Sequence, residues 1–272
     1  MPPQPQFPKA VSAVLFTGSG SIYEACRRHL PCRQLSLRRA SDAAFRQALE
    51  GVEVVVHNAA NLHCASVEQA VADNFLPTVR LVNLCLERPH PPRLLYLSSM
   101  SILADEGRYR AVEDMDPYAY SKYLGETYCL KSALPEVCCV RFSTLFYEDP
   151  RKDGLSRLAA DAVQHRRITL LNGGEARRDF LPLDVAAAYL AQLVRRFPRR
   201  GALNLAAGQA TSFREVSEWL RKRLPGLKVE NRPAPNGKPV LHRFSPPPPE
   251  WVEPIAFSLE EAVARYLQTL QS

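Results

Sequence analysis

Short apolar runs alternate along the chain with longer segments of helical periodicity. Several runs are rich in β-branched residues, which is typical of strands buried on both faces. The predicted strands are Val14–Thr17, Gln34–Leu37, Val52–His57, Arg93–Leu97, Val137–Phe142 and Leu203–Ala206. The predicted helices are Ile22–His29, Ala43–Leu49, Val67–Glu87, Tyr118–Ser132, Leu155–Arg166, Asp184–Arg196, Phe213–Leu224 and Leu259–Leu270. This order predicts an α/β fold with a Rossmann-like, doubly wound parallel sheet covered by helices on both faces.

Charge and cysteine content narrow the classes of partner. The net charge is +7, and its basic pairs are scattered along the chain instead of gathering with aromatic residues. We therefore expect no nucleic-acid partner, although the positive field favours an anionic small-molecule substrate. Seven cysteines form no CxxC pair, which predicts reduced thiols and no metal site. No apolar run is long enough for a membrane span, and the proline-rich start lacks a signal-peptide core, so we expect a cytoplasmic protein without a membrane partner.

A glycine turn joins the first predicted strand to the first predicted helix. Its residues are Gly18-Ser19-Gly20-Ser21-Ile22-Tyr23, the GxGxx spacing of a dinucleotide-binding loop in the right structural context. The first glycine permits the tight turn, and the second lets a pyrophosphate approach the backbone. Tyr23 replaces the glycine that normally allows close helix packing, so we expect it to tilt the helix or to point outward. Two glycines at such a turn also occur for purely structural reasons.

The end of the second predicted strand bears on the cofactor. An acidic residue there usually binds the ribose of NAD, whereas an arginine accommodates the 2′-phosphate of NADP. This chain has Arg38 and Arg39 and no acid, which favours NADP. The alternative is that both arginines only face solvent. Little chain separates this strand from Val52–His57, so one strand–helix unit is shortened or missing, and the arginines could follow a different strand.

The most informative stretch is Tyr118-Ala119-Tyr120-Ser121-Lys122. Tyr118 and Lys122 are four residues apart and share one face of a helix. A nearby ammonium favours the phenolate, so the pair can exchange a proton with a carbonyl or an alcohol. Upstream, Ser98 and Ser99 follow a strand and offer hydroxyls to a substrate oxygen. YxxxK alone is common by chance, but its combination with the glycine turn, the apolar strand and the two serines is not.

With these motifs in order, the sequence resembles the extended short-chain dehydrogenases/reductases of the NAD-dependent epimerase/dehydratase type. The resemblance spans nearly the whole chain. It rests on FTGSGSI, VVVHNAA with Asn74 and Thr78 in the next helix, YLSSMSI, DPYAYSKYLGE, VRFSTLFY, RRDFLPLDVAAAYL and LNLAAG.

The resemblance implies a role for each matching residue. Tyr118 is the general acid/base, Lys122 lowers its pKa and holds the nicotinamide ribose, and Ser99 orients the substrate oxygen. Arg178 matches a position that contacts the substrate diphosphate in sugar-nucleotide members, and Thr144 is a further substrate-binding position. The implied cofactor-binding residues are Gly18, Gly20, Ser21, Ile22, Arg38, Asn58, Ala59 and Ala60, with Tyr118 and Lys122.

The sequence also departs from the family pattern. The glycine loop is one residue shorter than TGxxGxxG. Thr144 stands where many sugar-nucleotide members carry Asn, and Tyr147 where they carry Gly. Met100-Ser101 replaces the Asp-Glu of 4,6-dehydratases, which argues against that reaction. The proline-rich start predicts a loose tail over 1–10, followed by a Rossmann domain over 11–145 plus 182–208. Because the chain is short for the family, we expect only a small C-terminal substrate-binding lobe over 146–181 plus 209–272.

Together these features predict an NAD(P)-dependent oxidoreductase or epimerase that acts on a hydroxyl or carbonyl of a sugar, with a nucleotide-linked sugar favoured, and with NADP favoured over NAD. Two alternatives stay open. One is a ketoreductase for a non-sugar carbonyl, which Thr144 and the small lobe favour. The other is a non-catalytic cofactor-sensing module with a degenerate glycine loop. Many relatives dimerise through the helix that matches Tyr118–Ser132, so a homodimer is also open.

Overall fold

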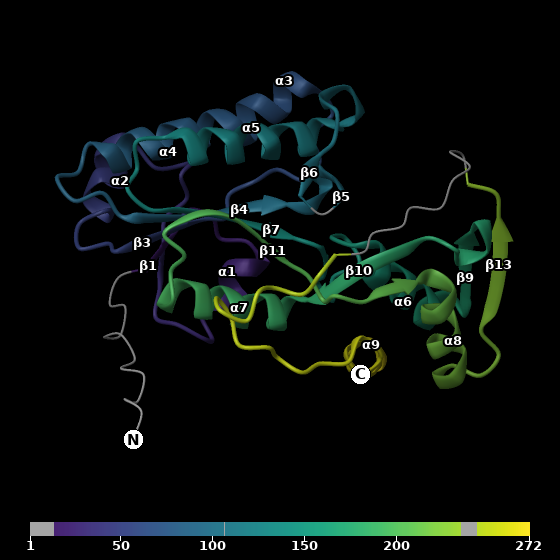
Figure 1. Ribbon diagram of the computed structural model, residues 1–272. Coiled ribbons are helices and arrows are strands. Elements are labelled where there is room, and N and C mark those ends of the chain that lie inside the picture. Colours follow the sequence, from purple (N-terminus) through teal and green to yellow (C-terminus); the bar gives the residue numbers. More distant parts are fainter. Residues whose placement is uncertain (1–13, 106, 235–243) are drawn as a thin grey trace.

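The computed structural model describes residues 14–105, 107–234 and 244–272. The predicted tail over 1–10 lies outside them. Six parallel strands form the main sheet in the order β11-β7-β4-β3-β1-β2 (Figure 1). Their bounds are β1 Val14–Phe16, β2 Arg33–Gln34, β3 Val54–His57, β4 Arg93–Ser99, β7 Val137–Phe142 and β11 Arg200–Leu205. The predicted α/β, Rossmann-like fold class is confirmed.

The strand order reverses at β1. The chain leaves β1, forms β2 at the edge of the sheet, and then crosses to the other side of β1 to form β3. A complete Rossmann sheet of order 3-2-1-4-5-6 has one more strand beyond β2. The expected absence of one strand–helix unit is therefore confirmed. Arg38 follows β2, the strand that neighbours β1. The predicted strand Gln34–Leu37 is displaced, because regular pairing ends at Gln34. The amides of Leu35 and Leu37 still bond to carbonyls at the end of β1.

Alternate side chains of the strands enter two separate cores. Val14 and Phe16 face α1 (Ser21–Cys26) and α7 (Leu183–Arg195). Leu15 faces the opposite core, under α2 (Asp42–Ala48), α4 (Leu76–Leu86) and α5 (Pro117–Lys131). Figure 1 shows α2, α4 and α5 above the sheet and α1 and α7 below it. This two-sided burial explains why the strands are apolar at nearly every position.

Several helix boundaries differ from the sequence prediction. The N-cap of α2 is Ser41, whose hydroxyl accepts from the amide of Ala44 at 3.2 Å, and Asp42 lies in the first turn. Asp184 likewise lies in the first turn of α7, whose N-cap is Pro182. The predicted helix Val67–Glu87 is divided into α3 (Val67–Ala70), a π-helical turn η1 (Val71–Phe75) and α4.

The rest of the chain builds a second core beside the carboxyl end of the main sheet. Phe146 and Phe180 lie at its centre, and the amphipathic α6, α8 and α9 cover it. Its elements are β8 Thr144–Phe146, α6 Gly154–His165, β9 Arg167–Leu171, η4 Asn172–Gly174, β10 Arg177–Pro182, β12 Ala210–Ser212, α8 Phe213–Arg223, β13 Lys228–Arg232 and α9 Leu259–Gln271. The strands form a mixed β12-β10-β8 sheet and a parallel β13-β9 pair. The exact domain boundaries stay a prediction.

A few short elements lie between β4 and α5. A hairpin of β5 (Leu103–Asp105) and β6 (Arg108–Tyr109) follows the 3-10 turn η2 (Met100–Ile102), and η3 (Val112–Asp114) precedes α5. None of the helices in the described residues is long and apolar enough to cross a membrane.

Candidate active site

A cavity of about 1380 Å³ lies where the main sheet meets the second core. It is at the carboxyl ends of the strands, beside the reversal of strand order, where open α/β sheets bind ligands. It brings together these predicted residues: Gly20, Ser21, Ile22, Asn58, Ala60, Ser99, Tyr118, Lys122, Thr144 and Arg178. Gly18, Arg38 and Ala59 are not part of its wall. Gly18 is part of the glycine loop, Ala59 lies against it, and Arg38 lies outside the cavity.

The helix α5 is placed by its cap and by one close approach to the sheet. The carboxylate of Asp116 accepts from the amide of Ala119 at 2.7 Å, and Pro117 occupies the first helical turn. Gly125 faces the buried Tyr96 of β4, and a Cβ at this position would collide with the Tyr96 hydroxyl. Only glycine lets the helix lie this close to β4, which fixes the height of Lys122 above the strand.

Lys122 is buried between α5 and β4. Its ammonium donates to the backbone carbonyl of Leu97 at 2.6 Å and lies 4.8 Å from the centre of the Tyr96 ring. Burial lowers the pKa of Lys122 to about 8. The cation is thus held in one position at the base of the cavity.

Tyr118 and Ser99 meet at the same end of the cavity. Burial raises the pKa of Tyr118, the neighbouring Tyr147 phenol adds to this, and the hydrogen bond with Ser99 opposes it. The net shift of the Tyr118 pKa is therefore upward, because burial disfavours the phenolate. Lys122 is not among the groups that set this shift, so its expected lowering of the Tyr118 pKa stays a prediction. At neutral pH Tyr118 is a proton donor. The Ser99 hydroxyl also lies 2.9 Å from that of Ser101.

The glycine loop is held by one amide side chain. The Oδ1 atom of Asn58 accepts from the amide of Gly18 at 2.7 Å, and its Nδ2 donates to the Gly18 carbonyl at 3.0 Å. A Cβ on Gly18 would press on Ala59 at 3.2 Å. At Gly20 nothing lies within 4 Å of an added Cβ, so the backbone there is open to the cavity. This open stretch of backbone fits the close approach of a dinucleotide pyrophosphate.

Tyr23 packs inward. Its ring lies 5.5 Å from that of Phe16 and joins the core between the sheet, α1 and α7. Of the two expected arrangements, the outward-pointing one is wrong, because the ring packs against Phe16 of β1. A tilt of the helix stays a prediction. Tyr23 is not among the described residues that line the cavity.

The π-helical turn η1 places Asn74 against α5. The Asn74 side chain accepts from the amide of Asn61 at 2.6 Å and donates to the Ser121 hydroxyl at 3.0 Å. Ser121 in turn donates to the carbonyl of Tyr118 at 2.7 Å. Such turns are frequent at functional sites. Asn74 thus joins the loop after β3 to the helix that carries Tyr118.

Arg38 lies in the turn after β2, the edge strand that pairs with β1, where the strand order reverses. Its guanidinium donates to the backbone carbonyl of Asp73 at 2.9 Å and to Oδ1 of Asn74 at 3.4 Å. No acidic residue occupies the end of β2 or the turn that follows it. A cation therefore stands where a ribose-binding carboxylate would favour NAD.

The far half of the cavity is basic, which the sequence analysis missed except for Arg178. Arg157, Asp161 and His165 line it from α6, and Arg167 lines it from β9. Burial lowers the pKa of Arg178, and the like charge of Arg110 lowers it further. The spacing of four between Arg157, Asp161 and His165 places them on one face of the predicted helix, which is a signal that could have found them.

A family comparison identifies the chain. The model of the NAD dependent epimerase/dehydratase family matches residues 14–206, from β1 to the end of β11. The chain belongs to this family. It is therefore a member of an NAD(P)-dependent enzyme family.

Solved structures of the same fold include several sugar-nucleotide enzymes. The NAD-dependent NDP-hexosamine 5,6-dehydratase TunA of tunicamycin biosynthesis has a TM-score of 0.78 and 22% identity, covering 96% of this chain and 98% of its own. UDP-glucuronic acid 4-epimerase from Bacillus cereus, in complex with UDP-glucuronic acid and NAD, has a TM-score of 0.77 and 15% identity, with coverage of 95% and 99%. RMD from Pseudomonas aeruginosa, complexed with NADPH, has a TM-score of 0.75 and 17% identity, with coverage of 96% and 100%. At these identities the likeness shows the fold.

Proposed function

We propose that this protein is an NAD(P)-dependent oxidoreductase or epimerase that acts on a hydroxyl or carbonyl carbon of a nucleotide-linked sugar. The observation that carries the proposal is the convergence of Ser99, Tyr118 and Lys122 with the open glycine loop around one cavity. Bound NAD(P) would supply hydride chemistry. Gly20, Ser21 and Ile22 would hold its pyrophosphate, and Lys122 its nicotinamide ribose.

The side chains of the chain itself account for the proton transfer. Ser99 orients the substrate oxygen, and Tyr118 donates a proton to it or removes one. Because its pKa is raised, Tyr118 is protonated at neutral pH, which favours protonation of a carbonyl oxygen during reduction. Lys122 stays cationic below about pH 8, and its positive charge stabilises negative charge on groups bound at this end of the cavity.

The basic half of the cavity supports an anionic substrate. Arg157, Arg167 and Arg178 line it together with two aspartates, Asp153 and Asp161. The like charges of Arg178 and Arg110 repel each other, and a bound diphosphate would relieve this repulsion. The sugar-nucleotide complexes of two similar structures, with UDP-glucose and with UDP-glucuronic acid, agree with this proposal. A ketoreductase for an uncharged carbonyl compound has no use for this charge.

The Tyr118→Phe variant tests catalysis against the non-catalytic alternative. Turnover is followed with a panel of UDP-, dTDP- and GDP-sugars, by NAD(P)H absorbance and by chromatography of the products. We expect turnover to fall by about 10²–10⁴-fold while dinucleotide binding persists. Consumption of NAD(P)H indicates reduction, and a redox-neutral new sugar indicates epimerisation. Equal turnover in the variant would contradict the role of Tyr118, and a wild-type protein inert toward every sugar would favour the sensing module.

The cofactor preference rests on Arg38 and is tested separately. We expect NADPH to bind more tightly than NADH when nicotinamide fluorescence is titrated. The Arg38→Ala variant should lose roughly tenfold in NADPH affinity and little in NADH affinity, because a charged hydrogen bond contributes about 1.5–3 kcal/mol. Arg39→Ala is the matched control. Tighter binding of NADH by the wild-type protein would overturn the preference for NADP.

A further inference from the structure

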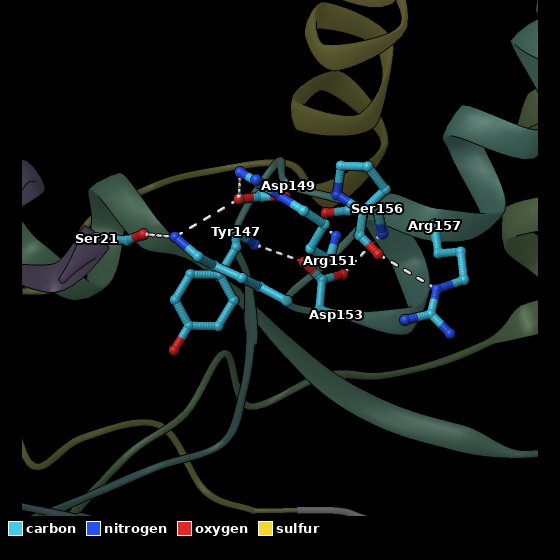
Figure 2. Close-up of polar contacts among 9 residues, drawn as sticks. Ser21, Tyr147, Asp149, Arg151, Asp153, Ser156 and Arg157 are labelled. Carbon is cyan, nitrogen blue, oxygen red and sulfur yellow. Dashed lines mark hydrogen bonds and ion pairs between the residues drawn. The ribbon is translucent and has the colours of Figure 1, made fainter. Parts of the chain in front are cut away.

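Lys152 reaches the glycine loop from the other side of the cavity. It lies between β8 and α6, at the start of the second core, and its ammonium donates to the hydroxyl of Ser21 at the beginning of α1. Both residues line the cavity together with Gly20 and Ile22. Figure 2 shows Ser21 at one edge of a polar cluster that also contains Asp149 and Asp153.

The backbone that carries Lys152 is braced by its own polar contacts. The carboxylate of Asp153 accepts from the amide of Tyr147 at 2.9 Å and from the amide of Ser156 at 2.7 Å. The amide of Lys152 donates to the carbonyl of Asp149 at 2.9 Å. The side chain passes over Tyr147, with the ammonium 5.9 Å from the ring centre. These contacts point Lys152 toward the glycine loop.

The charge of Lys152 is only partly neutralised. Asp149 is its acidic neighbour, at 3.5 Å, but Arg151 binds both oxygens of Asp149 at 3.1 Å. An ammonium has three donors. Ser21 and Asp149 use two of them, and Ser21 is uncharged. One donor therefore remains for an anion in the cavity, and Lys152 shares its acidic neighbour with Arg151.

We propose that Lys152 binds the diphosphate of the dinucleotide cofactor, opposite the glycine loop, and so provides the loop with a charged side chain from the second core. This inference rests on the proposed function, since it needs a dinucleotide at Gly20–Ile22. The diphosphate is held from both sides, and the two parts of the protein are joined across the bound cofactor.

Binding titrations test this without turnover. NADPH, NADH and ADP-ribose are titrated calorimetrically against the wild-type protein, Lys152→Met and Lys152→Arg, with Lys131→Met on the exposed end of α5 as the charge-matched control. We expect Lys152→Met to weaken all three ligands about tenfold, Lys152→Arg to retain most of the affinity, and Lys131→Met to match the wild type. The affinity of Lys152→Met should also depend less on salt. Thermal unfolding of each variant establishes that it is folded.

UDP serves as the second source of a diphosphate. We expect its affinity to be the same in the wild type and in Lys152→Met. Loss of UDP binding alone would overturn the proposal and assign Lys152 to the substrate. Unchanged dinucleotide binding in Lys152→Met would also overturn it, while the proposed function stands. A wild-type protein that binds neither dinucleotide nor ADP-ribose would refute the proposed function itself, and this inference with it.

Discussion

The catalytic helix and the glycine loop face the same cavity but are held in different ways. Lys122 on α5 is fixed by a buried carbonyl and an aromatic ring, and Gly125 lets the helix lie against Tyr96. The glycine loop is fixed by two hydrogen bonds from Asn58 to the backbone of Gly18. The helix therefore depends on packing that tolerates few substitutions. The loop depends on its backbone path, so it can lose a glycine and still present Gly20 to the cavity.

The largest effect should come from breaking the buried support of the catalytic helix. Glu126, one turn after Lys122, is fully buried and accepts from Nε of Arg141 at 2.9 Å and from the Tyr109 hydroxyl at 2.8 Å. We expect Glu126→Ala to lower the free energy of unfolding by about 3–5 kcal/mol, because it leaves a buried guanidinium unpaired. Urea unfolding measures this.

The double variant Glu126→Met/Arg141→Met controls for the unpaired charge. Replacing a buried ion pair by apolar side chains of similar size is often neutral or stabilising, so the double variant should regain most of the lost stability. If Glu126→Ala unfolds at the same urea concentration as the wild type, the support of α5 does not depend on this pair. The contrast with the loop would then be wrong.

The second effect concerns Tyr23, where the sequence of the loop looks damaged. We expect Tyr23→Ala to lower the free energy of unfolding by about 1–2 kcal/mol, because a half-buried ring leaves Phe16. Dinucleotide affinity should stay the same, since the ring does not line the cavity. A gain in affinity, measured by nicotinamide fluorescence, would show that the tyrosine does restrict the loop.

These two regions also show what a sequence can predict. The pair Tyr118 and Lys122 was found because its spacing is local and helical. The same is true of the apolar strands, whose parallel order followed from their alternation with helices. The inward packing of Tyr23 and the reach of Lys152 to Ser21 depend on contacts between segments far apart in the chain. The upward shift of the Tyr118 pKa was missed because it comes from burial, which no local pattern shows.

The third effect tests the backbone path of the loop. Asn58→Ala removes both bonds to Gly18, and we expect dinucleotide affinity to fall about tenfold, since each bond contributes about 0.5–1.5 kcal/mol. Asn58→Asp keeps an acceptor for the Gly18 amide and loses the donor to its carbonyl. Its affinity should lie between the wild type and Asn58→Ala. Affinity equal to the wild type in both variants would mean that the loop holds its path without this side chain.

The last effect is the pH dependence of stability caused by His57, which lies behind both regions. It is buried between Thr17, at 2.7 Å from Nδ1, and Thr78, at 2.9 Å from Nε2. Burial, followed by the positive charges of Lys122 and Arg38, lowers the pKa of His57 from 6.5 to about 3. The unfolded chain therefore binds more protons than the folded protein between these two pH values, so this histidine makes stability fall as the pH falls through that window.

The pH dependence of His57→Gln separates this contribution from that of the carboxylates. Glutamine keeps polar atoms for both threonines but does not titrate. As the pH is lowered below 6.5, the free energy of unfolding of the wild type should fall by up to about 1.4 kcal/mol per pH unit more than that of the variant. Urea unfolding at a series of pH values measures the difference. Parallel curves would mean that His57 is protonated as easily in the folded protein as in the unfolded chain. Water would then reach His57, which lies between the glycine loop and α5, in spite of its contacts with Thr17 and Thr78.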